Sequence, residues 1–326
     1  MTCLLVLFQC NFYILEQHID SGEQGIQLVS MTLSCLENIL SWDFVKTGSS
    51  DDLLSKRSKP LILPIEFQAL MMPQVSSTLF RASALLFNQP ALAMKPLACL
   101  IPLSGIQGAV LDSNQAATTF LTHFIHGVSS YLEILIRSSS NRPDDFGDKV
   151  FSVAQIAKNM FYSFPLSLVA SISTIQPLLR QLCELTVLCI STSIDDSYDT
   201  WLLDAGDDFL IIWSTLVEKI EYATPEDLPS LSTGAGIPSF CDQLAAICGE
   251  IVNAYVSKQL QPPSIDEEFD GEDLEEKDYD LHQEQLINIA ILARVCADDI
   301  LGKLLAAFQG KAIHLAALFH GSISIM

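Results

Sequence analysis

Residues 74–103 read QVSSTLFRASALLFNQPALAMKPLACLIPL, and this stretch decides the fold. In both halves apolar residues recur every three or four positions, which is the period of an amphipathic helix. The halves meet at Asn88–Gln89, directly before a proline, and so short a connection predicts a helical hairpin over about 74–87 and 90–103. A single hairpin cannot bury both of its apolar faces, so this stretch also predicts stacking against neighbouring hairpins.

The same helical period continues on both sides of this hairpin, and no strand-like alternation persists. The other predicted helices cover about 21–42, 115–137, 148–162, 200–222, 239–259 and 281–307, with proline-punctuated helices over about 165–191. Successive hairpins recur about every 40 residues, which is the spacing of HEAT and armadillo-like repeats, although no motif repeats cleanly at that interval.

The predicted fold class is therefore all-α: a HEAT-type α-α superhelix, that is, a solenoid of antiparallel helical hairpins with no sheet and a right-handed superhelical drift. Residues 1–326 are expected to form a single solenoid segment of about five to six hairpins. We expect an acidic loop at 262–280 and ends of atypical sequence at 1–20 and 311–326.

Two capping patterns and a set of core residues make this fold testable. Ser21 with Gln24 predicts a capping box that opens the helix running to Trp42, and Ser239 with Asp242 predicts the cap of a later helix. The residues expected to be largely buried are Trp42, Leu121, Phe124, Trp213, Ile247, Val252, Ile289 and Leu292.

Composition limits the kinds of partner. The chain carries 39 acidic and 17 basic residues, a formal net charge of −22. A charge of this sign and size disfavours nucleic acid and anionic membranes as partners and favours basic proteins. Nine cysteines show no C-x-x-C spacing and sit mostly among aliphatic residues, which is typical of reduced thiols in a reducing compartment.

No membrane insertion is expected. Residues 1–15 are apolar, but they lack the basic start and the small-residue cleavage site of a signal peptide. The apolar stretch 84–111 is interrupted by three prolines and by Lys95, so it offers no clean span of about 20 apolar residues.

The acidic run DEEFDGEDLEEKDYD, residues 266–280, is the most conspicuous local feature. Its acids are the candidate partner-binding residues: Asp266, Glu267, Glu268, Asp270, Glu272, Asp273, Glu275, Glu276, Asp278 and Asp280. One interpretation is a solvated, solubilising linker. The other is an electrostatic attractor for a basic partner, because focused negative potential speeds encounter. The run begins like a calcium-binding EF-hand loop, but the twelfth position is Lys277 instead of the bidentate glutamate.

Nothing in the sequence assembles a catalytic, metal or cofactor site. His123 and His126 lie one helical turn apart, but no third ligand accompanies them, and zinc needs three or four. Cys241 and Cys248 lie on one face of one helix and are interpreted as core. The glycines at 234 and 236 follow no strand, so they form no dinucleotide-binding fingerprint. We expect no enzyme activity, no metal and no cofactor.

Three stretches together resemble a known family. They are residues 36–44 (LENILSWDF), residues 99–127 with LTHFIHG at their end, and the acidic run leading into Ile291-Leu292-Ala293-Arg294. In this order and spacing they are similar to exportin-4-like karyopherins of the importin-β superfamily, and the resemblance covers roughly residues 24–305.

The resemblance implies a nuclear transport receptor built of HEAT repeats. It implies binding of basic protein cargo and of the GTPase Ran, contact with nuclear pore proteins, and shuttling between nucleus and cytoplasm for nuclear export. The amino-terminal repeats and the carboxy-terminal half of that family have no counterpart here, so the chain is expected to be a fragment. The alternative that the residues leave open is a generic cytosolic α-solenoid scaffold for protein–protein interaction.

Overall fold

The hairpin quoted above folds as α3 (Pro73–Leu85) and α4 (Pro90–Ser104), which pack against each other. Pro90 occupies the first turn of α4, where the fixed backbone angle of proline suits a helix start and its missing N–H is not needed. The computed structural model describes residues 2–22, 25–42, 61–71, 73–111, 113–192, 200–223, 239–260, 275–297, 300–302, 305 and 309.

Most of the remaining α-helices match predicted ones, but α1 was not predicted and α12 has different bounds from the predicted 281–307. The α-helices are α1 (Thr2–His18), α2 (Ile26–Leu40), α5 (Asn114–Ser138), α6 (Phe146–Ser163), α7 (Leu166–Ala170), α8 (Ile175–Ser191), α9 (Thr200–Glu221), α11 (Phe240–Gln259) and α12 (Glu275–Val295). Short 3₁₀ helices are η3 (Ile65–Met71), η4 (Ala109–Leu111) and η5 (Ser139–Asn141).

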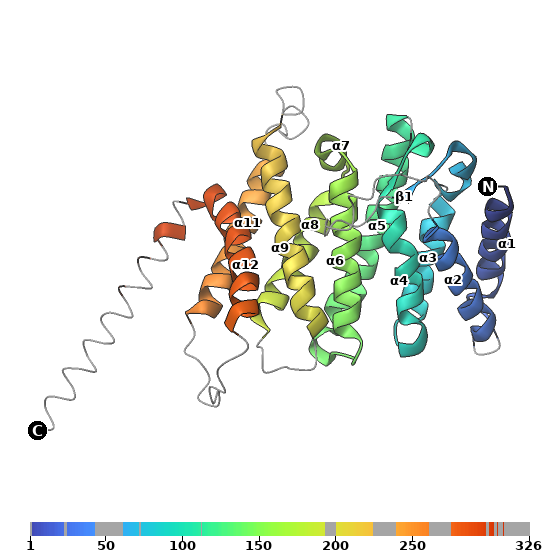
Figure 1. Cartoon of the computed structure of the whole chain (residues 1–326), viewed down its shortest axis with the longest axis horizontal. Helices are drawn as coiled ribbons and strands as arrows, with labels where there is room; N and C mark the ends of the chain where they lie inside the picture. The colour runs from blue at the N-terminus through green and yellow to red at the C-terminus, as the bar shows by residue number, and fades with distance from the viewer. Residues whose placement is uncertain are drawn as a thin grey trace, which may run out of the picture.

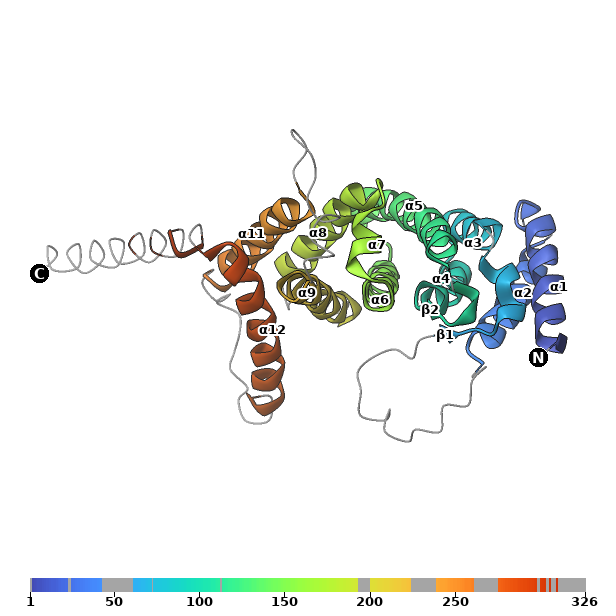
Figure 2. The same cartoon turned by 90° about the horizontal axis from the view of Figure 1, so that it is seen from above.

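The helices form two layers, which are seen from above in Figure 2. The first layer contains α3, α5, α8 and α11, each packed on the next, and the second layer contains α2, α4, α6, α9 and α12 in the same manner. Hairpins such as α8–α9 and α11–α12 join the layers, and the hairpins stand side by side along the long axis in Figure 1. The prediction of an all-α helical solenoid is confirmed.

The core runs along the whole stack between the two layers. Among the residues expected to be buried, seven are: Leu121, Phe124, Trp213, Ile247, Val252, Ile289 and Leu292. The Trp213 side chain illustrates the packing, because its indole N–H donates a hydrogen bond to the hydroxyl of Thr186 on α8 at 2.9 Å. The prediction for Trp42 is wrong, since this residue is 58% exposed. It lies beyond Ser41, the C-cap of α2, and so outside the buried stripe.

The prediction of no sheet is wrong in one place. The strands β1 (Leu61–Ile62) and β2 (Ile106–Gln107) form a two-residue parallel pair. Gly108, with φ +102°, lets the chain turn directly after β2, and a Cβ there would lie 2.8 Å from the Leu63 carbonyl oxygen. The close backbone approach, rather than any alternating pattern, produces this pair.

Helix ends test the capping predictions. Ser239 and Asp242 form the predicted capping box at the start of α11. The predicted box at Ser21 is wrong as a helix start, because α2 begins at Ile26 with Gly25 as its N-cap. The last strong helix begins at Glu275 rather than near Leu281, so residues 275–280 of the predicted acidic loop are helical. Acidic residues in a first helical turn are favoured by the helix dipole, which explains the earlier start.

Within the described residues, no helix has both the length and the apolar character needed to cross a membrane.

Close helix packing around Gly127 gives a stability prediction. A Cβ atom at Gly127 of α5 would lie 2.1 Å from the Phe80 ring of α3, so an alanine there has to displace the ring. We expect Gly127→Ala to lower the free energy of unfolding by about 1–3 kcal/mol through overpacking, despite the better helix propensity of alanine. Urea unfolding measures this loss. Gly302→Ala is the matched control, since nothing lies within 4 Å of a Cβ there. Equal stability of both variants would contradict the expected clash.

Candidate protein-interaction surface

The predicted acidic run leads into α12. Asp266, Glu267, Glu268, Asp270, Glu272 and Asp273 lie outside the described residues. Glu275, Glu276, Asp278 and Asp280 belong to the first turns of α12, where the backbone but not the side chains is described. In Figure 1 the helices α6, α9 and α12 all begin at the lower edge of the molecule. In Figure 2 the N-terminal half of α12 projects from the second layer.

Helix α9 lies at the centre of this surface and is joined to α6 by a ladder of polar contacts. The Lys158 ammonium on α6 pairs with Asp208 at 2.5 Å. Further along both helices, the Thr215 hydroxyl lies 3.1 Å from the Tyr162 hydroxyl, and the Lys219 ammonium donates to the Phe161 carbonyl oxygen at 2.5 Å. Asp208 near the start of α9 meets Lys158, and Lys219 near its end meets the last residues of α6, so the two helices run parallel.

A second ladder joins α9 to α12. The Gln285 amide donates to Asp207 at 2.6 Å, and the Ser214 hydroxyl donates to Asn288 at 2.8 Å. Near the far ends of the two helices, Arg294 pairs with Glu221 at 3.3 Å. These contacts place α12 beside α9 from Gln285 to Arg294, and the two helices run in the same direction.

The carboxylates at this edge interact with one another. Burial raises the pKa of Asp207, the hydrogen bond from Gln285 lowers it, and the negative charges of Asp204, Asp208 and Glu284 raise it further. Asp204 itself is exposed. We call the N-terminal turns of α6, α9 and α12 with these carboxylates the acidic edge.

The lysine and arginine side chains described in the structure already contact other groups of the same molecule. The ion pairs are Arg81–Asp20, Arg137–Glu133, Lys149–Asp145, Lys158–Asp208, Arg180–Glu250 and Arg294–Glu221. Lys95, Lys219 and Lys258 donate hydrogen bonds to backbone carbonyl oxygens of neighbouring helices, and Arg142 lies over the ring of Phe146. Since these cations serve the stack itself, the acidic excess of the chain remains for solvent and for partners.

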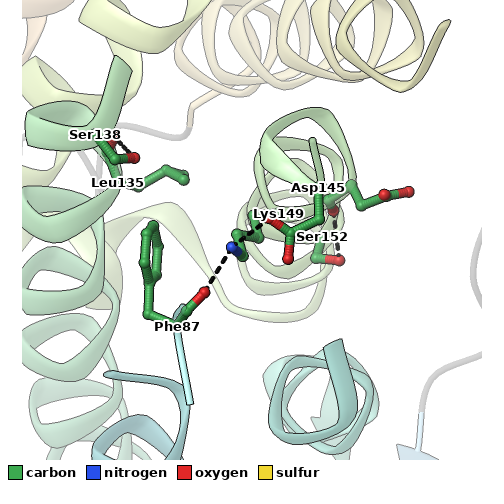
Figure 3. A network of polar contacts seen from close by, with 7 residues as sticks. Phe87, Leu135, Ser138, Asp145, Lys149 and Ser152 are labelled. Atoms are coloured by element: carbon green, nitrogen blue, oxygen red, sulfur yellow. Dashed lines mark hydrogen bonds and ion pairs between the residues drawn. The ribbon is translucent and has the colours of Figure 1, made fainter. Parts of the chain in front are cut away.

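One of these cations is fully buried and holds the start of α6. Lys149 is 0% exposed, donates to the Phe87 carbonyl oxygen at 2.8 Å and pairs with Asp145 at 2.6 Å, as Figure 3 shows. Its ammonium also lies 4.1 Å from the centre of the Phe87 ring. Burial raises the pKa of the neighbouring Tyr131 hydroxyl, and the charge of Asp145 raises it further. The contact joins the α3–α4 turn to the hairpin that follows.

The same arrangement recurs further along the stack. Lys219 donates to carbonyl oxygens at the end of α6, and Lys258 donates to the Thr192 carbonyl oxygen at the end of α8 at 2.6 Å. Burial lowers the pKa of both lysines. Free carbonyl groups at helix C-termini attract cations, so each lysine fastens one hairpin to its neighbour.

The other residues considered from the sequence do not assemble a site. His123 and His126 are both exposed on α5, and no group of three metal-binding side chains occurs among the described residues. Burial raises the pKa of Cys248 to about 12, which keeps this thiol neutral, and Cys241 is half-buried. The glycines at 234 and 236 lie outside the described residues.

A cleft of about 560 Å³ lies between the start of α5 and the α6–α7 connection. Its lining includes Gln107, Asn114, Thr118, Ser163, Phe164 and Ser167, and none of the described lining residues is charged. These described residues offer no titratable group for acid–base chemistry and no charge for a basic partner.

The sequence interpretation missed the α9 part of the acidic edge. Asp204, Asp207 and Asp208 were not singled out from the sequence, although three acids within five residues are a detectable signal. The hydrogen bond between Gln285 and Asp207, which brings this group beside α12, joins residues 78 apart in the sequence.

Fold and surface together define a class: a two-layer α-solenoid whose second layer presents an acidic edge. No protein-family model matches the chain. It is similar to Ran-binding protein 16 of Drosophila melanogaster, with 23% identity over 298 residues, which is 90% of this chain and 24% of that protein. The chain thus spans about a quarter of the length of this relative. The similarity supports a distant relationship to the importin-β superfamily but does not single out the exportin-4-like branch.

Proposed function

We propose that this chain is a segment of a nuclear transport receptor and that it binds a basic protein partner at the acidic edge. The proposal rests mainly on how charge is distributed. The described lysine and arginine side chains make ion pairs or other contacts within the stack, while the chain as a whole carries a net charge of −22. The distant similarity to a Ran-binding protein supports the transport role.

The partners we propose are the GTPase Ran, basic protein cargo and nuclear pore proteins, met while the receptor shuttles between nucleus and cytoplasm during nuclear export. The chain acts by binding alone, without a cofactor. A stacked array suits this role, because its stability comes from contacts between neighbouring hairpins and leaves a long surface open to a partner.

Electrostatics explains how such a surface selects its partner. Carboxylates gathered at one edge focus negative potential, which speeds the encounter with a basic protein and repels acidic ones. The ladders between α6, α9 and α12 hold the carboxylates on rigid helices, so little conformational entropy is lost when a partner binds.

The test is retention of Ran by the immobilised chain. We expect Ran loaded with a non-hydrolysable GTP analogue to be retained more strongly than Ran loaded with GDP, at low and at physiological salt. Lysozyme, a basic protein unrelated to transport, is the control. If Ran is retained equally with either nucleotide, or no more strongly than lysozyme, the Ran-binding role is refuted. The generic scaffold is then the better interpretation.

A further inference from the structure

An exposed tryptophan stands at the acidic edge. Trp201 lies in the first turn of α9 and is 45% exposed. Its ring contacts Phe151 of α6, with the ring centres 5.1 Å apart and the planes at 44°. This contact supports one side of the indole, and the exposed remainder is a large apolar surface of the kind that is enriched in binding sites.

Carboxylates surround this indole on the same helix. Asp204 follows Trp201 by one helical turn, so the two side chains are neighbours on the helix surface, and Asp204 is exposed. Asp208 follows a turn later and already pairs with Lys158. Asp207 points toward α12, where it accepts the hydrogen bond from Gln285. Asp204 is therefore the carboxylate of this group that faces solvent beside Trp201.

We propose that Trp201 and Asp204 form an anchor for an arginine side chain of the basic partner. The inference rests on the proposed function, because it names the chemistry by which the acidic edge recognises that partner. A guanidinium group is planar, stacks on an indole face and at the same time donates hydrogen bonds to a carboxylate. A lysine ammonium is a compact, strongly hydrated point charge and stacks less well.

The charge distribution supports the choice of a cationic occupant. Lys158, which lies on the neighbouring α6, is already paired with Asp208 and is only 13% exposed. A neutral apolar partner would leave Asp204 desolvated without a counter-charge, and this is costly. An arginine-bearing segment satisfies the indole face and the carboxylate together.

The experiment measures the affinity of two short peptides of equal length, one alternating arginine with glycine and one alternating lysine with glycine. We expect Trp201→Ala to weaken binding of the arginine peptide about fivefold to tenfold and that of the lysine peptide about twofold. Trp201→Phe should retain an intermediate affinity, because phenylalanine preserves packing on Phe151 but offers a weaker π face. Asp204→Asn should weaken both peptides. Fluorescence anisotropy at physiological salt gives the dissociation constants.

Trp42→Ala is the matched control, since Trp42 is also exposed but lies just beyond the C-terminal end of α2, outside the acidic edge. It should leave both affinities unchanged. If the wild-type chain binds both peptides and Trp201→Ala binds them equally well, the anchor is refuted while the proposed function stands. If Trp42→Ala loses as much affinity, the anchor is also refuted. If the wild-type chain binds neither peptide, the proposed function itself fails.

Discussion

Replacing Lys149 with alanine is expected to lower the free energy of unfolding by about 3–5 kcal/mol, the typical cost of removing one member of a buried ion pair. The substitution removes the donor to the Phe87 carbonyl oxygen and leaves Asp145, with 12% of its side chain exposed, without its cation. It also empties the space that the lysine stem occupies between the α3–α4 turn and α6. Urea unfolding followed by circular dichroism measures the loss.

Two further variants test whether the loss of stability comes from the burial of the Lys149–Asp145 pair. Arg137→Ala removes an exposed pair of the same i,i+4 spacing, with side chains 77% and 55% exposed, and should cost less than about 1 kcal/mol. The double variant Lys149→Met with Asp145→Leu replaces both charges by apolar groups and should recover much of the stability. If Lys149→Ala costs no more than Arg137→Ala, the buried lysine does not join the hairpins as we describe.

Neutralising the acidic run is expected to slow association with a basic partner about tenfold or more at low salt, and much less at physiological salt. The variant changes seven acids to serine or glutamine: Glu267, Glu268, Asp270, Glu272, Asp273, Glu275 and Glu276. The reason is that encounter is steered by the local potential at the acidic edge. Stopped-flow or surface-based kinetics at two salt concentrations measure the association rate, and circular dichroism checks that helix content is unchanged.

A control variant removes negative charge from other faces by changing the exposed Glu37, Glu66, Glu133 and Glu184 to glutamine. It should slow association much less per charge removed. An unchanged association rate for the acidic-run variant at both salt concentrations would favour the linker interpretation. Equal effects per charge in the two variants would show that net charge, and not the position of the run, controls the encounter.

Local pattern was sufficient for most of the fold. The spacing of apolar residues in 74–103 predicted α3 and α4 nearly to their ends, because a hairpin of amphipathic helices depends only on near neighbours in the sequence. The capping box at Ser239 was predictable for the same reason. The prediction at Trp42 was wrong because the spacing of apolar residues along a helix does not indicate at which residue the chain leaves the stack.

The sequence by itself determined that this protein is helical, that its helices pair, that it is strongly acidic and where the acidic run lies. Each of these properties depends on composition or on contacts within one hairpin. Only the tertiary structure decided which polar groups meet. The hydrogen-bonded partners Lys149 and Phe87 are 62 residues apart, and Asp207 and Gln285 are 78 residues apart. Such pairs depend on the register in which whole hairpins stack, and that register is set by the shapes of many packed side chains together. For this reason the acidic edge emerged only once α6, α9 and α12 were placed side by side, although Trp201 and Asp204 are neighbours within one helix.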